Sequence, residues 1–283
     1  MGQNTSKEVA SPELVNASRS FPPNEWAKLI ETAFRIQKDS SNKKLDAIVI
    51  DRVKFVALFS VPGTSFGSNL YSFFKAEGAV LNLIRFAQGM QKCCKGRPQV
   101  ALKVLYEMGA QEKPSHDGDA VVSALEIILA MNSVSFPDNS GDIDVTPFVT
   151  GFHSDPRSAI APDDECENFR QWCDQTFDSF HIIIRQFLEG RYLNQTLSPE
   201  SCLFNPGTLP EPSHILSPAH VFGLAATESR LQCSWSRLYC SLTDGMDFDR
   251  LCYSLQVRPR LRYMRGLCEV NCNYWNEGRK EGL

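Results

Sequence analysis

Several cysteines could carry chemistry, because a thiolate can act as a nucleophile or bind a metal ion. Cys166 and Cys173 are seven residues apart on one face of a predicted helix, and His181 follows them. Trp172 and Phe177 flank Cys173, however, and a cysteine among such residues usually behaves as a small apolar core residue. We therefore predict a structural role for this group, with neither catalysis nor metal binding.

Two other cysteine pairs are weaker candidates. Cys268 and Cys272 have CxxxC spacing, but a structural zinc site usually has two such pairs and no second pair accompanies this one. Cys93 and Cys94 lie between two lysines, whose charge could lower a thiol pKa and make the pair reactive or open to acylation. The alternative is a turn that ends a helix at Gly96, and we favour it because glycine commonly terminates helices.

The segment 136–148, FPDNSGDIDVTPF, has the spacing of a calcium-binding EF-hand loop. Gly141 falls where that loop needs a sharp turn, and Asp138 falls at a ligand position. Phe136 and Pro147 occupy the first and last ligand positions, where calcium requires oxygen atoms. We predict a degenerate helix–loop–helix that does not bind calcium. Because the known phosphate-loop, dinucleotide, protease and kinase motifs are also missing from the sequence, we predict that the protein is not an enzyme and has no cofactor.

The N-terminal sequence MGQNTSK fits the myristoylation pattern M-G-x-x-x-[ST], with Gly2 as the acceptor and Ser6 as the hydroxyl residue. The alternative is a chance match, since both residue types are common. One myristoyl chain gives only marginal, reversible membrane binding, and Lys7 with Arg19 does not form a polybasic patch. We predict lipidation at Gly2 and membrane association that needs help from a partner protein or from the C-terminal tail.

The chain has 283 residues, a net charge of −4 and 42% hydrophobic residues. This composition is ordinary for a soluble protein and long enough for about two domains. No window has the ~18 to 20 uninterrupted apolar residues of a membrane-spanning helix, and the N-terminus lacks the apolar region of a secretory signal. We therefore predict a cytoplasmic, peripherally membrane-associated protein whose ten cysteines stay reduced.

Positive charge is concentrated at the C-terminal end. Residues 256–283 contain six basic and three acidic residues, so this tail has a charge of +3 and the rest of the chain −7. Such a tail could contact anionic lipid or nucleic acid. Four arginines within eight residues are a weak signal for a nucleic-acid site, and we predict no nucleic-acid partner.

Apolar residues recur at helical spacing along most of the chain, which predicts paired helices. Helical windows start at 24 and at 98, and extend over 45–59, 68–75, 79–92, 119–131 and 163–193. Phe169, Trp172 and Cys173 are the predicted core of the last window. The predicted organisation is a flexible myristoylated arm (1–23), a helical domain (24–195), a proline-rich linker (196–212), a partial second domain (213–255) and an atypical basic tail (256–283).

Three segments together resemble the TLDc-domain proteins of the mTOR-associated kind. FAQGMQKCCKGRPQVALKVLYEMG (86–109) is similar to the helix–KG–helix junction of their EF-hand-like region. FRQWCDQTFDSFHIIIRQFLEGRYL (169–193) is similar to their helical segment with an F-x-x-W-C core. SPAHVFGLAATESRLQCSWSRLYCSLTDGMDFDRLCYSL (217–255) resembles the opening of the TLDc domain. The TLDc-like core positions of this last segment are Trp235, Leu238, Tyr239, Phe248 and Leu251.

The resemblance implies a mainly α fold, in which an EF-hand-like paired-helix N-terminal domain precedes the truncated start of an α+β TLDc sandwich. Residues 256–283 lack the alternation and the glycine-rich strands expected there, so the TLDc domain is predicted to stop after residue 255. The resemblance also implies protein partners in the mTOR pathway or the V-ATPase, and a lysosomal location. The expected function is a non-catalytic adaptor, and the alternative is protection against oxidative stress by cysteines.

Overall fold

The computed structural model describes residues 11–39, 44–75, 80–112, 119–136, 143–156, 164–177, 179–193, 204, 206, 218–228 and 231–232. Within these ranges the fold is mainly α, as predicted, and none of the residues belongs to a strand. The chain divides into two compact units, of which the first contains residues 1–208 and 214–233. The second contains 209–213 and 234–283, which lie outside the described residues.

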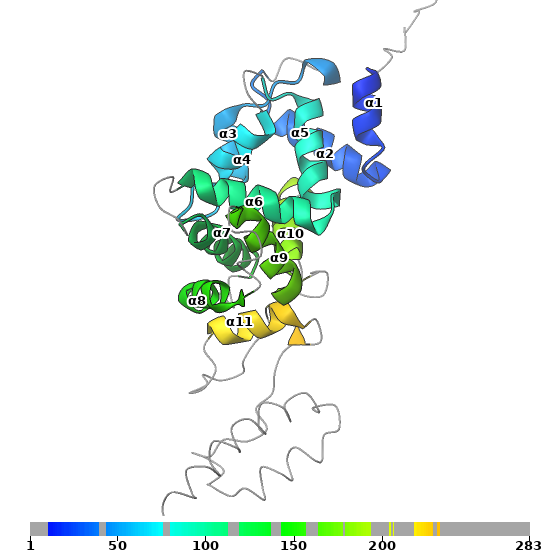
Figure 1. Ribbon diagram of the computed structural model, residues 1–283. Coiled ribbons are helices and arrows are strands. Elements are labelled where there is room, and N and C mark those ends of the chain that lie inside the picture. Colours follow the sequence, from blue (N-terminus) through cyan, green and yellow to red (C-terminus); the bar gives the residue numbers. More distant parts are fainter. Residues whose placement is uncertain are drawn as a thin grey trace, which may run out of the picture. The chain divides into compact units, whose positions relative to one another are not determined.

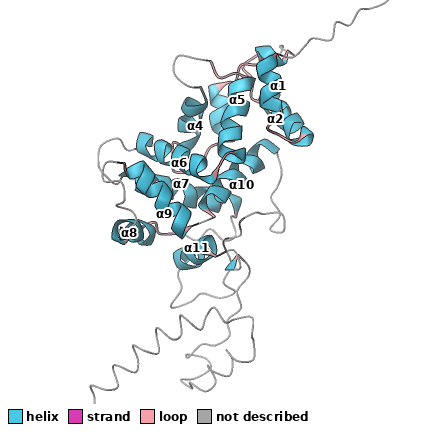
Figure 2. Cartoon of the chain, turned by 45° about the vertical axis from the view of Figure 1, so that its right-hand side comes forward, coloured by secondary structure: helices cyan, strands magenta, loops and turns pink. Residues whose placement is uncertain are grey.

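Figure 1 shows the helices of the first unit in chain order, coloured from blue to yellow. Their bounds are α1 Pro12–Ser18, α2 Pro23–Arg35, η1 Leu45–Ala47, α3 Arg52–Leu58, α4 Phe66–Lys75, α5 Leu83–Met90, η2 Gln91–Lys95, α6 Pro98–Glu112, α7 Asp119–Ser135, α8 Thr146–Ser154, α9 Glu165–Thr176, α10 Phe180–Leu193 and α11 Pro218–Thr227. Figures 1 and 2 both show α1, α2 and α5 toward one end of this unit, and α8 and α11 toward the other.

Polar residues fix where several of these helices begin. Ser11, Asp51, Asn82 and Asp164 precede α1, α3, α5 and α9, and the side-chain oxygen of each accepts a hydrogen bond from the backbone N–H three residues further on, at 2.9–3.3 Å. These bonds satisfy N–H groups that have no partner inside the helix. Proline stands in the first turn of other helices, where its missing N–H does no harm.

The loops of two helix–loop–helix pairs meet near the N-terminal end of the unit. The loop between α2 and α3 contacts the loop between α4 and α5, because the N–H of Ile50 donates to the carbonyl of Leu81 at 2.8 Å. Isolated antiparallel bridges join Val49 to Asn82 and Gln37 to Ile50. The same helix pairs contain a cluster of aromatic rings, formed by Phe55, Phe59, Tyr71, Phe74 and Phe86. Its four phenylalanines are buried and Tyr71 is partly buried.

The centre of the unit is built from α6, α7 and α10, which pack against one another. The crossing of α6 and α7 is tight at Gly109, since a Cβ added there would lie 2.5 Å from the carbonyl oxygen of Ala120 and 2.8 Å from the nitrogen of Ala124. Only a residue without a side chain allows this approach of two helix backbones. The crossing therefore depends on one small residue on α6 facing two alanines on α7.

A second group of aromatic rings holds α8, α9, α10 and α11 together. Phe222 of α11 lies 5.9 Å from Phe148 of α8 and 6.1 Å from Phe180 of α10, measured between ring centroids. Phe204, which precedes α11 in the chain, lies 5.7 Å from Phe222. The amide of Gln186 fixes the backbone of Phe204 from both sides, accepting from its N–H at 2.9 Å and donating to its carbonyl at 3.4 Å.

The structure differs from the predicted domain boundaries at both ends of the helical domain. Residues 11–23 were expected in a flexible arm, but α1 packs on α5, and Leu14, Ala17 and Phe21 are buried. Leu14 and Ala17 share one face of α1, because a helix brings positions three to four apart onto one face, and Phe21 follows the helix. The helical unit therefore includes residues from 11 onward.

At the C-terminal end, the predicted linker and the predicted start of the TLDc-like segment contribute to the same core. Phe204 is fully buried, and α11 lies in the first unit together with α8 and α10. Phe204 lies between Pro199 and Pro206, and the positions of these prolines do not reveal that its side chain is buried. Residues 137–142 of the degenerate calcium loop lie outside the described residues, and α7 and α8 flank them.

Candidate functional site

The predicted core residues of the helical domain lie on α9. Phe169 and Cys173 are fully buried, and Trp172 is 2% exposed. Trp172 packs edge-to-face against Phe152, with ring centroids 5.4 Å apart. The ring of Phe169 lies 5.8 Å from that of Tyr106 of α6, at an inclination of 39°. These residues join α9 to α6 and α8 and have a structural role.

The other predicted positions cannot be placed. Gly2 lies outside the described residues, and so do the five TLDc-like core positions, Trp235, Leu238, Tyr239, Phe248 and Leu251. The basic tail and the pair Cys268 and Cys272 also fall in this part of the chain. The predictions made for them stay predictions.

The thiols in the described part of the chain are poor nucleophiles. Burial raises the pKa of Cys93 to about 12, although the positive charge of Lys92 acts in the opposite direction. Burial also raises the pKa of Cys94 and of Cys173 well above the ordinary thiol value, and that of the half-buried Cys166 to about 11. Since the thiolate is the reactive form, all four thiols stay protonated and slow to react near neutral pH.

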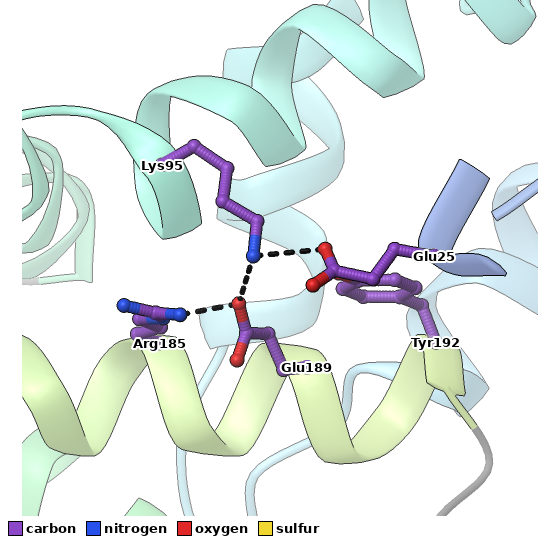
Figure 3. A network of polar contacts seen from close by, with 5 residues as sticks. All are labelled: Glu25, Lys95, Arg185, Glu189 and Tyr192. Atoms are coloured by element: carbon purple, nitrogen blue, oxygen red, sulfur yellow. Dashed lines mark hydrogen bonds and ion pairs between the residues drawn. The ribbon is translucent and has the colours of Figure 1, made fainter. Parts of the chain in front are cut away.

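A network of charged side chains surrounds the end of η2 (Figure 3). The ammonium of Lys95 lies 2.8 Å from Glu25 Oε2 and 2.8 Å from Glu189 Oε1. Arg185 Nε lies 3.0 Å from the same oxygen of Glu189, and the hydroxyl of Tyr192 donates to Glu25 Oε2 at 3.2 Å. The network thus connects η2 with α2 and α10, three elements that are distant in the sequence.

The backbone of η2 places Lys95 close to the carboxylates of Glu25 and Glu189. The π-helical turn η2 continues α5, and both Cys93 and Cys94 are buried on its inner side. The turn ends at Gly96, where an added Cβ would lie 2.5 Å from the carbonyl oxygen of Lys92. A π turn is wider than an α-helical turn and commonly marks a functional or strained position. Here its consequence is that the lysine after the buried thiols reaches two carboxylates.

The charges of the network are balanced, and all of them except that of Arg185 are largely shielded from water. Side-chain exposure is 17% for Lys95, 20% for Glu25 and 14% for Glu189, so the ion pairs are screened less than those on the surface. Burial lowers the pKa of Lys95, but its hydrogen bonds with Glu189 and Glu25 outweigh burial and the net pKa is raised. Burial and the nearby Cys94, Glu189 and Glu25 raise the pKa of Tyr192, which keeps its hydroxyl protonated as a donor.

We expect the change Lys95→Met to lower the free energy of unfolding by about 1–2 kcal/mol at pH 7, less than for a fully buried pair. The change removes the ammonium between the carboxylates of Glu25 and Glu189. Because one oxygen of each lies 2.8 Å from that ammonium, these two oxygens are no more than twice 2.8 Å apart. Proton binding to either carboxylate relieves their repulsion, so the variant should regain stability as the pH falls from 7 to about 5. Urea denaturation at each pH measures this.

The native chain should behave differently from this variant. The pKa of Lys95 is raised in the folded state, so the charged lysine contributes to the free energy of unfolding. This contribution is complete below about pH 10, the ordinary pKa range of lysine, and is lost as the pH rises through the pKa of the folded state. Lys103→Met is the matched control, since Lys103 is 60% exposed and lies 3.8 Å from Glu107. Two results would contradict a stabilising role for the network. One is an equal loss of the free energy of unfolding in Lys95→Met and Lys103→Met, and the other is a Lys95→Met variant that gains no stability at low pH.

No group of three or more histidine, cysteine, aspartate or glutamate side chains within the described ranges could hold a metal ion. None of the helices described is both long enough and apolar enough to cross a membrane. Comparison of the chain with models of known protein families, with curated proteins and with solved structures found no match. The network around Lys95 is therefore characterised by its geometry alone. Sequence inspection missed it because Lys95 and Glu189 are 94 residues apart in the chain.

Proposed function

We propose that this protein is a non-catalytic adaptor that associates with membranes through a myristoyl group on Gly2. The observation that carries the proposal is the N-terminal sequence MGQNTSK, which combines a glycine at position 2 with a serine at position 6. A myristoyl group on Gly2 would be followed by a polar segment and then by the helical unit that begins with α1. The helical unit would present protein-binding surfaces to its partners.

The finer proposal follows the resemblance to mTOR-associated TLDc proteins. The partners would belong to the mTOR pathway or the V-ATPase, and the site of action would be the cytoplasmic face of lysosomal or other internal membranes. The paired α2–α3 and α4–α5 units, whose loops are joined by the hydrogen bond from Ile50 to Leu81, are consistent with an EF-hand-like arrangement. Residues 213–255 would form the start of the TLDc sandwich.

Membrane attachment of this kind would be conditional. A single myristoyl chain binds a bilayer with an association constant of about 10⁴ M⁻¹, so the protein would exchange readily between membrane and solution. A partner at the membrane would convert this weak binding into stable attachment, because two linked weak contacts act together. The basic tail, at +3, could add attraction to anionic lipid.

The test is the change Gly2→Ala in a chain produced together with an N-myristoyltransferase. Wild-type protein should carry one myristoyl group by mass spectrometry and should sediment in part with phosphatidylcholine vesicles. The variant should lack the added mass, and its sedimentation should fall to the level of an unacylated chain, since it has lost the amino group that accepts the acyl chain.

Asn4→Ala is the matched control because it lies inside the same segment and leaves the glycine and the serine of the pattern in place. It should be acylated and should sediment like the wild type. An unmodified Gly2 in the presence of the transferase would refute the proposal, and so would a Gly2→Ala chain that sediments like the acylated protein.

A further inference from the structure

A pocket of about 370 Å³ lies between α8, α9 and α11. This volume is within the range of small-molecule sites, roughly 300–1,000 Å³. Among the residues that line it are Phe148, Gly151, Asp155, Trp172, Thr176 and Phe177. We refer to it as the α8–α11 pocket.

Aromatic rings form much of the wall of the α8–α11 pocket. The rings of Trp172 and Phe177 are 5.0 Å apart and inclined at 73°, and those of Phe148 and Phe177 are 5.7 Å apart and inclined at 61°. Steeply inclined rings present faces in different directions. Phe180 stacks on one face of Phe177, with ring centroids 4.6 Å apart. An aromatic face that borders the pocket carries negative electrostatic potential and attracts a cation, most strongly for tryptophan.

The polar groups of the pocket favour the same kind of occupant. Asp155, at the end of α8, and His220 of α11 both line the pocket, and no lysine or arginine is among the described residues that do so. The hydroxyl oxygen of Thr176 is buried and has no hydrogen-bond partner in the part of the chain that the structure describes. A buried hydroxyl without a partner is unfavourable unless a bound molecule supplies one.

Two glycines keep the pocket open. A Cβ added at Gly151 would lie 3.9 Å from the ring of Trp172, and one added at Gly223 would lie 3.3 Å from the ring of Phe148. Both positions line the pocket, and Gly151 is exposed on α8. Larger side chains at these positions would occupy the space beside the aromatic rings.

We propose that the α8–α11 pocket binds a quaternary ammonium group that carries a hydroxyl, as in choline or a choline headgroup. The methylated cation would contact the aromatic wall, which attracts positive charge and also accepts methyl groups. The carboxylate of Asp155 would complement its charge, and the hydroxyl of Thr176 would pair with that of the ligand. A neutral apolar ligand of the same shape would use the aromatic surface but gain nothing from the carboxylate.

Titration calorimetry of the full, unacylated chain with choline chloride tests this proposal. We expect saturable binding to one site with a Kd of about 1 mM or lower. The neutral isostere 3,3-dimethyl-1-butanol, in which carbon replaces the ammonium nitrogen, should bind at least tenfold more weakly. Equal affinity for both compounds, or no saturable binding of choline, would overturn the proposal.

Variants of the lining residues separate the contributions of the carboxylate, the open space and the hydroxyl. Circular dichroism shows whether each variant remains folded. Asp155→Asn keeps the shape of the side chain and should weaken choline binding about tenfold. Gly151→Leu fills space from an exposed helical position and should abolish binding of both compounds. Thr176→Val should remove the preference for choline over tetramethylammonium, which has no hydroxyl. Folded variants that bind choline like the wild type would place the ligand elsewhere and overturn the assignment.

Vesicles distinguish the two sources of a choline group, which are a lipid headgroup and a soluble molecule. Phosphatidylcholine vesicles that retain the unacylated chain, and release it on addition of choline, would identify a lipid headgroup as the ligand. Choline binding without retention by these vesicles would identify a soluble molecule. Either result agrees with the proposal, whereas retention that is equal on phosphatidylglycerol vesicles and insensitive to choline would contradict the lipid source. Because no acyl group is present, these outcomes are independent of Gly2.

Discussion

Replacing Phe222 with alanine is expected to lower the free energy of unfolding of the helical unit by about 3–5 kcal/mol, the usual effect of deleting a buried phenylalanine ring. Phe222 is 1% exposed and contacts Phe148, Phe180 and Phe204. The ring therefore joins α11 to α8 and α10. Its removal leaves a cavity that these three aromatic neighbours cannot fill without moving their own helices.

Urea denaturation followed by circular dichroism measures this loss. Thr227→Ala is the matched control on the same helix, because Thr227 is exposed and its hydroxyl donates only to the carbonyl of Gly223, at 2.7 Å. It should change the free energy of unfolding by less than about 0.5 kcal/mol. A loss below about 1 kcal/mol for Phe222→Ala would show that α11 is not an integral part of the helical unit.

Gly109→Ala is expected to destabilise the protein by about 3 kcal/mol, at the upper end of the usual effect of overpacking. The new Cβ would meet backbone atoms of α7, at 2.5 Å from the oxygen of Ala120 and 2.8 Å from the nitrogen of Ala124. Backbone atoms in a helix cannot rotate away as a side chain can. The two helices would have to separate, which opens the central core.

Gly151→Ala is the matched control for this change, since it is the same substitution in an exposed position of α8. Its nearest contact is an ordinary one of 3.9 Å with the ring of Trp172, and alanine favours a helix over glycine. We expect a gain of about 0.5–1 kcal/mol in the free energy of unfolding. Losses of similar size in both variants would contradict the close crossing of α6 and α7.

An adaptor of the proposed kind holds its partners in a fixed arrangement. A partner bound to one end of the helical unit can be positioned relative to the other end only if the helices between them are rigidly packed. The crossing at Gly109 and the attachment of α11 by Phe222 are two of the contacts that pack these helices together. The network around Lys95 adds a third connection, between η2, α2 and α10.

Local sequence patterns predicted most of the helices. Helical windows at 68–75 and 79–92 correspond closely to α4 and to α5 with η2, and the window that starts at Pro98 corresponds to α6. The sequence predicts one helical pattern over 163–193, but the structure breaks it between α9 and α10. Phe177 has φ −135° and ψ 70°, which is not helical, and the next described backbone N–H, that of Ser179, donates to Ala226 of α11.

By itself, the sequence determined the mainly α class and the apolar face of α9, because helix formation and amphipathic spacing depend on residues within a few turns of one another. Only the tertiary structure decided that α1, Phe204 and α11 belong to the helical unit, that Lys95 meets Glu25 and Glu189, and that three aromatic residues line a common pocket. These contacts join segments far apart in the chain. No spacing within a single helix specifies which distant side chain a given residue will meet.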